Sequence, residues 1–177
     1  MKQLDGTGMK RLHRDWRRRT DGRVALALDD VQGPFNVGAI IRTAAALRVD
    51  DVWLAARTPA PDDPKVGKTA LGTDRYLTFH RVDTAIEAIA AARSAGYHVV
   101  GLELADGALP LHELDTFDAT CVVVGHEDRG CSPATLDACD EVAFVPQLGR
   151  VGSLNVATAA SIALYELRRR AWSATPA

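Results

Sequence analysis

The chain has 177 residues, of which 47% are hydrophobic and 25% are charged, as is typical of one soluble globular domain with a sizeable core. No apolar run approaches the roughly 20 residues that a membrane-spanning helix needs, and no apolar signal segment follows the polar, basic start, so we expect a cytoplasmic protein. The net charge of −2 does not by itself predict a polyanionic partner.

The cysteines argue against a disulfide framework and against a zinc site. Cys121, Cys131 and Cys139 are odd in number, form no C-x-x-C pair, and lie in or beside apolar segments. We expect them to be core thiols, and we predict no metal.

Positive charge gathers at both ends of the chain. The basic residues near the start, which stand beside His13 and Trp16, are Lys10, Arg11, Arg14, Arg17, Arg18 and Arg19. Those near the end, beside Trp172, are Arg168, Arg169 and Arg170. One interpretation is contact with phosphates, with Trp16 stacking on a base. The other is a solvated helix face or tail, which charge runs alone favour.

Short apolar runs alternate with segments of helical periodicity. The predicted strands are 24–28, 52–54, 78–80, 97–102, 120–124 and 141–145. One predicted helix begins at Asn36. The others cover parts of 65–77, 83–94, 133–138 and 153–170. This alternation predicts an α/β fold, a mostly parallel sheet with helices on both faces. We expect a basic extension over 1–20 and a single domain over 21–177.

Three segments place glycines and polar residues directly after predicted strands. They are Asn36-Val37-Gly38-Ala39-Ile40-Ile41-Arg42-Thr43, Gly125-His126-Glu127-Asp128-Arg129-Gly130 and residues 146–157, PQLGRVGSLNVA. Open α/β sheets bind ligands at the carboxyl ends of their strands. Glycines let the backbone approach a ligand closely, and strand-to-helix turns offer unpaired N–H groups. The pattern predicts a site for a cofactor with polar ends.

In order and spacing, these segments resemble the three signature motifs of the SpoU (TrmH) branch of the SPOUT RNA methyltransferases. The resemblance implies an S-adenosylmethionine-dependent enzyme that methylates a ribose 2′-hydroxyl in RNA, with tRNA favoured over rRNA. It also implies a C-terminal deep trefoil knot and a homodimer without metal. The final predicted helix, with Ala159, Ala160, Ala163 and Leu164, is expected to supply part of the dimer contact.

Arg42 and Asn36 are the candidate catalytic residues of the first motif. In the family, the arginine at this position is thought to help activate the ribose hydroxyl together with an RNA phosphate. A guanidinium, with a pKa above about 12, is too weak an acid to be an easy base, so we expect phosphate clamping as the minimum role of Arg42. The alternatives are an ordinary surface ion pair for Arg42 and a helix N-cap for Asn36.

The second and third motifs add Glu127, Ser153 and Asn155 to the candidate catalytic residues. Glu127 stands in a glycine-framed turn and is expected to orient Arg42 or an RNA group. Ser153 and Asn155 open the final predicted helix, where one of them could act only as its cap. The resemblance implies that both position the ribose and the arginine. The neighbouring His126 is expected to tune the loop, and a role as base stays open.

The resemblance also implies which residues bind S-adenosylmethionine, mainly through their backbone. These candidates are Leu104, Gly125, Gly130, Val145 and Leu154. Gln147 and Leu148 depart from the more usual Ile-Pro-Met wording of the third motif, which leaves the fine cofactor contacts open.

Two other functions are alternatives to this one. The first is a catalytically inactive RNA-binding or assembly protein that keeps the fold, against which the intact Arg42, Glu127, Ser153 and Asn155 speak. The second is a Rossmann-type small-molecule methyltransferase, which predicts a glycine-rich turn after the first strand that this chain lacks.

Overall fold

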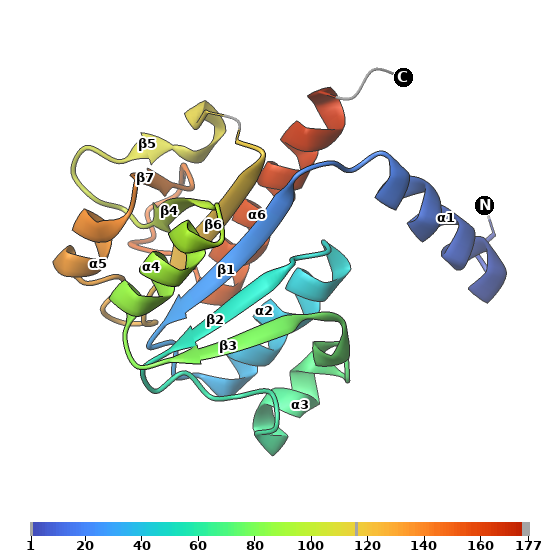
Figure 1. Ribbon diagram of the computed structural model, residues 1–177, viewed down its shortest axis with the longest axis horizontal. Coiled ribbons are helices and arrows are strands. Elements are labelled where there is room, and N and C mark those ends of the chain that lie inside the picture. Colours follow the sequence, from blue (N-terminus) through green and yellow to red (C-terminus); the bar gives the residue numbers. More distant parts are fainter. Residues whose placement is uncertain (1, 116, 175–177) are drawn as a thin grey trace.

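The computed structural model describes residues 2–115 and 117–174, and their strands form one parallel sheet (Figure 1). Within these residues the sheet has seven strands in the order β3-β2-β1-β6-β4-β7-β5, and every pairing is parallel. The strands are β1 (Arg23–Asp29), β2 (Asp51–Ala55), β3 (Thr78–Val82), β4 (His98–Leu102), β5 (Leu109–Pro110), β6 (Ala119–Val124) and β7 (Glu141–Phe144).

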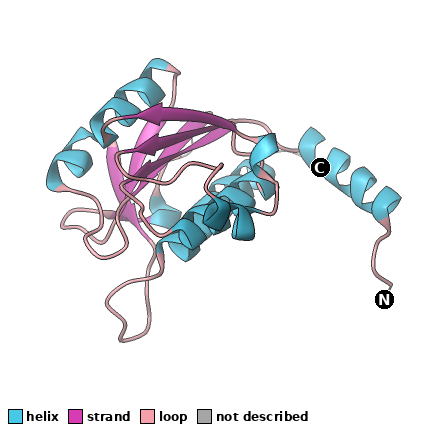
Figure 2. Ribbon diagram, turned by 90° about the horizontal axis from the view of Figure 1, so that it is seen from below, coloured by secondary structure: helices cyan, strands magenta, loops and turns pink. Residues whose placement is uncertain are grey.

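Helices cover both faces of the sheet, as Figure 2 shows in the turned view. They are α2 (Pro34–Ala46), α3 (Pro64–Ala70), α4 (Ala85–Ser94), α5 (Pro133–Ala138) and α6 (Val156–Ala174). A further helix, α1 (Gly6–Arg18), precedes β1, and two short 3₁₀ helices are η1 (Asp74–Tyr76) and η2 (Leu111–Glu113). The predicted α/β class with a mostly parallel, doubly covered sheet is confirmed.

The sheet separates two hydrophobic cores, because alternate residues of each strand point to opposite faces. In β1, Leu26 and Leu28 face α2, α3 and α6, whereas Ala25 and Ala27 face α4 and α5. A strand buried on both sides needs an uninterrupted apolar run, which is why 24–28 could be recognised from the sequence. Cys121 and Cys131 are buried in the second core, as expected of core thiols.

Two predicted helix starts were wrong. The helix α2 begins at Pro34, with Gly33 as its N-cap, so Asn36 lies inside the first turn and is not the cap. Proline suits the first helical position because its fixed φ matches the helix and its missing N–H is not needed there. The helix α6 begins at Val156, three residues after Ser153, because the Asn155 side chain accepts from Ala157 N and Thr158 N.

Three of the four α6 residues expected at a dimer contact, Ala160, Ala163 and Leu164, cannot lie there, and the prediction for Ala159 stays a prediction. Ala160, Ala163 and Leu164 are fully buried in the first core, and Ala159 packs against the same core. These side chains hold α6 on the sheet of their own chain. The larger apolar side chains that α6 exposes are Ile162 and Tyr165.

The basic N-terminal segment forms the helix α1, which stands away from the sheet (Figures 1 and 2). None of its residues is buried. Its end meets the end of α6, where the Trp16 and Trp172 rings lie 5.0 Å apart and Trp172 Nε1 donates to Thr20 Oγ at 2.7 Å. The two basic ends of the sequence therefore adjoin in space.

Helices long and apolar enough to cross a membrane are absent from the part of the chain that the structure describes.

Candidate functional site

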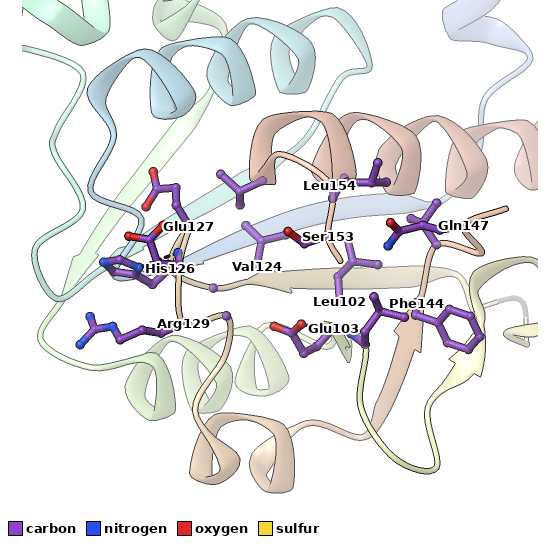
Figure 3. Close-up of a pocket in the computed structure, with 17 residues that line it drawn as sticks. Leu102, Glu103, Val124, His126, Glu127, Arg129, Phe144, Gln147, Ser153 and Leu154 are labelled. Carbon is purple, nitrogen blue, oxygen red and sulfur yellow. Dashed lines mark hydrogen bonds between the residues drawn. The ribbon is translucent and has the colours of Figure 1, made fainter. Parts of the chain in front are cut away.

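A cleft of about 260 Å³ opens at the carboxyl edge of the sheet (Figure 3). Its walls are the loops after β4, β6 and β7 and the start of α6. The lining residues from these segments are Leu102–Leu104, Val124–Gly130, Phe144, Val145, Gln147, Ser153, Leu154, Val156 and Ala159. The three loops follow neighbouring parallel strands, so their backbones converge on one space.

Glu127 ties the loop after β6 to the start of α2. One carboxylate oxygen accepts from Gly33 N at 2.8 Å and from Asn36 Nδ2 at 3.0 Å, and the other accepts from Gln32 N at 3.1 Å. Burial alone would raise the pKa of Glu127, but these hydrogen bonds outweigh it and hold the pKa below its ordinary value. Glu127 is therefore an anion that binds the positive end of the α2 dipole.

Asn36 and Asn155 extend this connection to α6. Asn36 donates to Glu127 and accepts from Asn155 Nδ2 at 3.0 Å. Asn155 uses its oxygen to cap α6, so one amide serves both helices. A further bond of 3.2 Å joins Ser161 Oγ to Thr43 Oγ1 on the same pair of helices. The three motifs are thus linked by one hydrogen-bonded path, Glu127 to Asn36 to Asn155.

The loop after β6 needs its two glycines for close packing. A Cβ atom on Gly125 would lie 2.2 Å from the Gly130 backbone, and one on Gly130, whose φ is +64°, would lie 2.1 Å from the Glu103 carboxylate. A larger residue at position 125 would push the backbone of this loop apart, and one at position 130 would adopt a strained left-handed conformation and displace the Glu103 carboxylate.

The structure brings four of the five predicted catalytic residues together. Glu127 and Ser153 line the cleft, and Asn36 and Asn155 join Glu127 through hydrogen bonds. Arg42 lies elsewhere, exposed on α2 outside the cleft lining, and no described residue hydrogen-bonds to its guanidinium. Glu127 does not touch Arg42. It fixes the first turn of the helix that carries Arg42.

All five residues predicted to bind the cofactor line the cleft. They are Leu104, Gly125, Gly130, Val145 and Leu154. Their role stays a prediction. His126 also lines the cleft, and its Nδ1 accepts from Asp128 N at 3.0 Å within the loop.

Sequence reasoning missed Glu103, which is also part of the cleft wall. Its carboxylate accepts from Leu104 N at 3.1 Å and from Cys131 N at 3.0 Å, and so joins the loops after β4 and β6. The available signal was an acidic residue directly after the predicted strand 97–102. Among the described residues, no group of three or more His, Cys, Asp or Glu side chains is arranged to hold a metal ion.

The sequence profile of the SpoU rRNA Methylase family matches residues 23–165, which include all three motifs and every strand of the sheet. The chain belongs to this family. The match begins after α1, so the projecting helix lies outside the part that defines SpoU proteins.

Individual SpoU relatives agree with this assignment. The 23S rRNA (guanosine-2′-O-)-methyltransferase RlmB of Acinetobacter baylyi is 36% identical over 151 residues, which are 85% of this chain and 61% of that protein. A crystal structure of an AdoMet-bound rRNA methyltransferase from Sinorhizobium meliloti has a TM-score of 0.79 and 31% identity, and the match covers 86% of this chain and 58% of that one. The chain spans less than two thirds of both proteins.

A third relative matches over most of its length. The crystal structure of the A. aeolicus TrmH/SpoU tRNA modifying enzyme has a TM-score of 0.75 and 25% identity, with 93% of this chain and 87% of that chain covered.

Proposed function

We propose that this protein is an S-adenosylmethionine-dependent RNA methyltransferase that methylates a ribose 2′-hydroxyl, with tRNA as the favoured substrate and rRNA as the other. The observation that carries the proposal is the path from Glu127 through Asn36 to Asn155, because it links all three motifs at the mouth of one cleft. The AdoMet-bound state of the S. meliloti relative and the name of the A. baylyi relative support the cofactor and the ribose chemistry.

The residues of the cleft fit this cofactor. Leu102, Phe144 and Leu154 offer apolar surface for a purine ring, and Glu103 and Glu127 place acidic groups in the cleft wall. Gln147 adds a buried oxygen, Oε1, to which no described residue donates a hydrogen bond. A ligand with a planar base and polar donors would match this combination.

S-adenosylmethionine supplies, when bound, a methyl group already activated by its positive sulfonium, so the protein must mainly orient a sugar oxygen and assist the loss of one proton. In such a transfer the hydroxyl proton would pass to solvent water, and the electron pair of the C–S bond would stay with sulfur. Glu127 contributes to this orientation by holding the first turn of α2. Asn36 and Asn155 fix α2 against α6. These residues set the geometry in which Arg42 meets the RNA.

Arg42 is proposed to clamp an RNA phosphate beside the reacting ribose. Its side chain is exposed one and a half to two helical turns beyond Asn36, on the face of α2 that also exposes Phe35. A guanidinium stays charged at neutral pH and binds phosphate oxygens in pairs, so it stabilises charge near the sugar without acting as a base.

Coverage by a relative and the charge of α1 support the substrate class. Of the relatives described above, the one that this chain covers most fully is called a tRNA modifying enzyme. The exposed basic helix α1 supports a polyanionic substrate of either kind. We therefore propose that residues 1–20 serve as an RNA-binding arm and residues 21–177 as the methyltransferase domain.

We also propose a homodimer and the trefoil knot of SPOUT proteins. Exposed apolar side chains on α6, Ile162 and Tyr165, and on the preceding loop, Leu148 and Val151, support a subunit contact. The position of β7 between β4 and β5 supports threading of the last segment, because a late strand is placed between two earlier ones. Light scattering of the purified protein should give twice the chain mass.

The experiment that tests the function measures transfer of labelled methyl groups from S-adenosylmethionine to tRNA and to rRNA. The RNA should come from cells that lack this protein, and nucleoside digestion should place the label on the ribose. We expect Arg42→Ala to lower turnover by about 100-fold or more, as for other lost charge-stabilising donors. Affinity for S-adenosylhomocysteine, measured by calorimetry, should stay within about threefold because Arg42 lies outside the cleft lining.

The matched control is Arg48→Ala, which removes an exposed arginine just beyond the other end of α2 and should leave turnover nearly unchanged. Unchanged turnover in Arg42→Ala would remove Arg42 from the mechanism. Cofactor binding without methyl transfer to any cellular RNA would favour the inactive RNA-binding protein.

A further inference from the structure

Gln147 carries a buried polar atom that has no hydrogen-bond partner among the described residues. Its Oε1 is buried and receives no hydrogen bond from any residue in the described part of the chain. Nearly all buried polar groups in folded proteins have a partner, since leaving one unpaired destabilises a protein by about 1–3 kcal/mol. An acceptor kept unpaired in the wall of a cleft points to a donor that arrives with a ligand.

The position of Gln147 narrows the kind of donor. Figure 3 draws Gln147 on the same side as Phe144 and Leu154 and on the opposite side from His126 and Arg129, and all of these residues line the cleft. Val145 adds apolar surface to the cleft, whereas Glu103 and Glu127 supply carboxylates. A flat, weakly hydrated group fits beside Gln147, and charged or strongly hydrated groups fit beside the carboxylates.

The chemistry of the proposed cofactor offers one group of that kind. Its hydrogen-bond donors are the adenine amine, two ribose hydroxyls and the ammonium of the methionine part. The adenine is the only planar, apolar-faced part, and its exocyclic amine is the only N–H donor on the ring. The exocyclic amine is thus the donor that is attached to a flat, apolar-faced ring.

We propose that Gln147 reads the adenine base of the cofactor by accepting a hydrogen bond from its exocyclic amine at Oε1. The inference rests on the proposed function in that it takes S-adenosylmethionine as the cofactor. Gln147 is then a specificity-determining residue, which rejects ligands whose base lacks the amine because Oε1 would stay unpaired beside them.

The test is a cycle of protein and ligand changes, measured by calorimetry without any methyl transfer. The ligands are S-adenosylhomocysteine, its counterpart with hydrogen in place of the 6-amino group, and 5′-methylthioadenosine, which keeps the base and lacks the amino-acid part. The proteins are the wild type, Gln147→Met and the control Arg150→Met, an exposed change in the same loop. Methionine matches glutamine closely in length and volume and removes the amide.

We expect loss of the amine to weaken binding to the wild type about tenfold and binding to Gln147→Met less than about twofold. Gln147→Met should bind 5′-methylthioadenosine about tenfold more weakly than the wild type does. Equal losses in both proteins would overturn the proposal. So would a Gln147→Met effect that disappears with 5′-methylthioadenosine, because that result would assign Gln147 to the ammonium.

A second measurement uses the protein without ligand. Removing an unpaired buried oxygen should raise the melting temperature of Gln147→Met by about 2–4 °C, although the same change weakens binding. A fall in melting temperature would show a structural role for the amide and would count against the proposal. If the wild type bound none of the three ligands, the proposed function itself would fail, whereas normal binding with no coupling would refute the Gln147 proposal alone.

Discussion

Both ends of this chain are rich in basic residues, but the fold exposes the basic side chains at one end and buries an arginine at the other. In α1 the basic side chains from Lys10 to Arg18 project from a helix with no buried residue. In α6 the Arg168 side chain is only 2% exposed, and it donates to the backbone oxygens of Leu47, Gly22 and Arg48. The same residue type is a surface charge at one end and an internal link at the other.

The difference follows from where each helix lies. The helix α6 packs on the sheet, so an arginine on its inner side meets the end of α2, where backbone carbonyls lack helical partners. Arg170 likewise donates to Leu114 O and His112 O, and Arg169 pairs with Glu166 at 2.7 Å. Neither interpretation of the basic ends, phosphate contact or a solvated helix face, therefore holds for Arg168, which is buried.

The strongest test of this contrast is Arg168→Met. The change removes the donor from three partly buried hydrogen bonds to carbonyl oxygens, so we expect the free energy of unfolding to fall by about 2 kcal/mol or more, measured by urea denaturation. Arg169→Met, on the exposed side of the same helix, should leave the denaturation midpoint nearly unchanged. A midpoint in Arg168→Met equal to that of the wild type would show that the internal link contributes nothing.

The opposite result is expected for α1. Arg14→Ala combined with Arg17→Ala should leave stability unchanged, because both side chains are exposed, but should weaken RNA binding about tenfold near 0.1 M salt. The slope of log affinity against log salt should fall by about 2, one for each lost phosphate contact. Arg169→Ala serves as the control at the other basic end, and an equal change in slope there would contradict the contrast.

The smallest expected effect concerns the contact that joins the two ends. Trp172→Ala removes the ring contact with Trp16 and the hydrogen bond to Thr20. An isolated helix of this length is marginal in water, so amide hydrogens of α1 should exchange about tenfold faster while those of the sheet do not change. Trp172→Phe, which keeps a ring, should give an intermediate rate. Unchanged exchange in Trp172→Ala would mean that α1 is held by other contacts.

Much of the fold could be predicted because its signals are local. The run 24–28 is apolar throughout, as a strand covered on both faces must be, and each motif follows such a run. The resemblance to the SpoU motifs implied Gly125, Val145 and Leu154 as residues of one site, and all three line the cleft. The strand β5 was missed because it has two residues, Leu109 and Pro110, which is too short for any periodicity.

The sequence by itself determined all strands but β5, the sheet class and the edge at which polar loops gather, because side-chain alternation and turn chemistry act between neighbours in the chain. Only the tertiary structure decided that Glu127 bonds Asn36 across 91 positions and that Asn155 bonds Asn36 across 119. It likewise decided that Arg168 is buried and that Gln147 Oε1 is unpaired. These outcomes depend on which distant groups the packing of helices on the sheet brings within hydrogen-bond distance, and no local pattern encodes that.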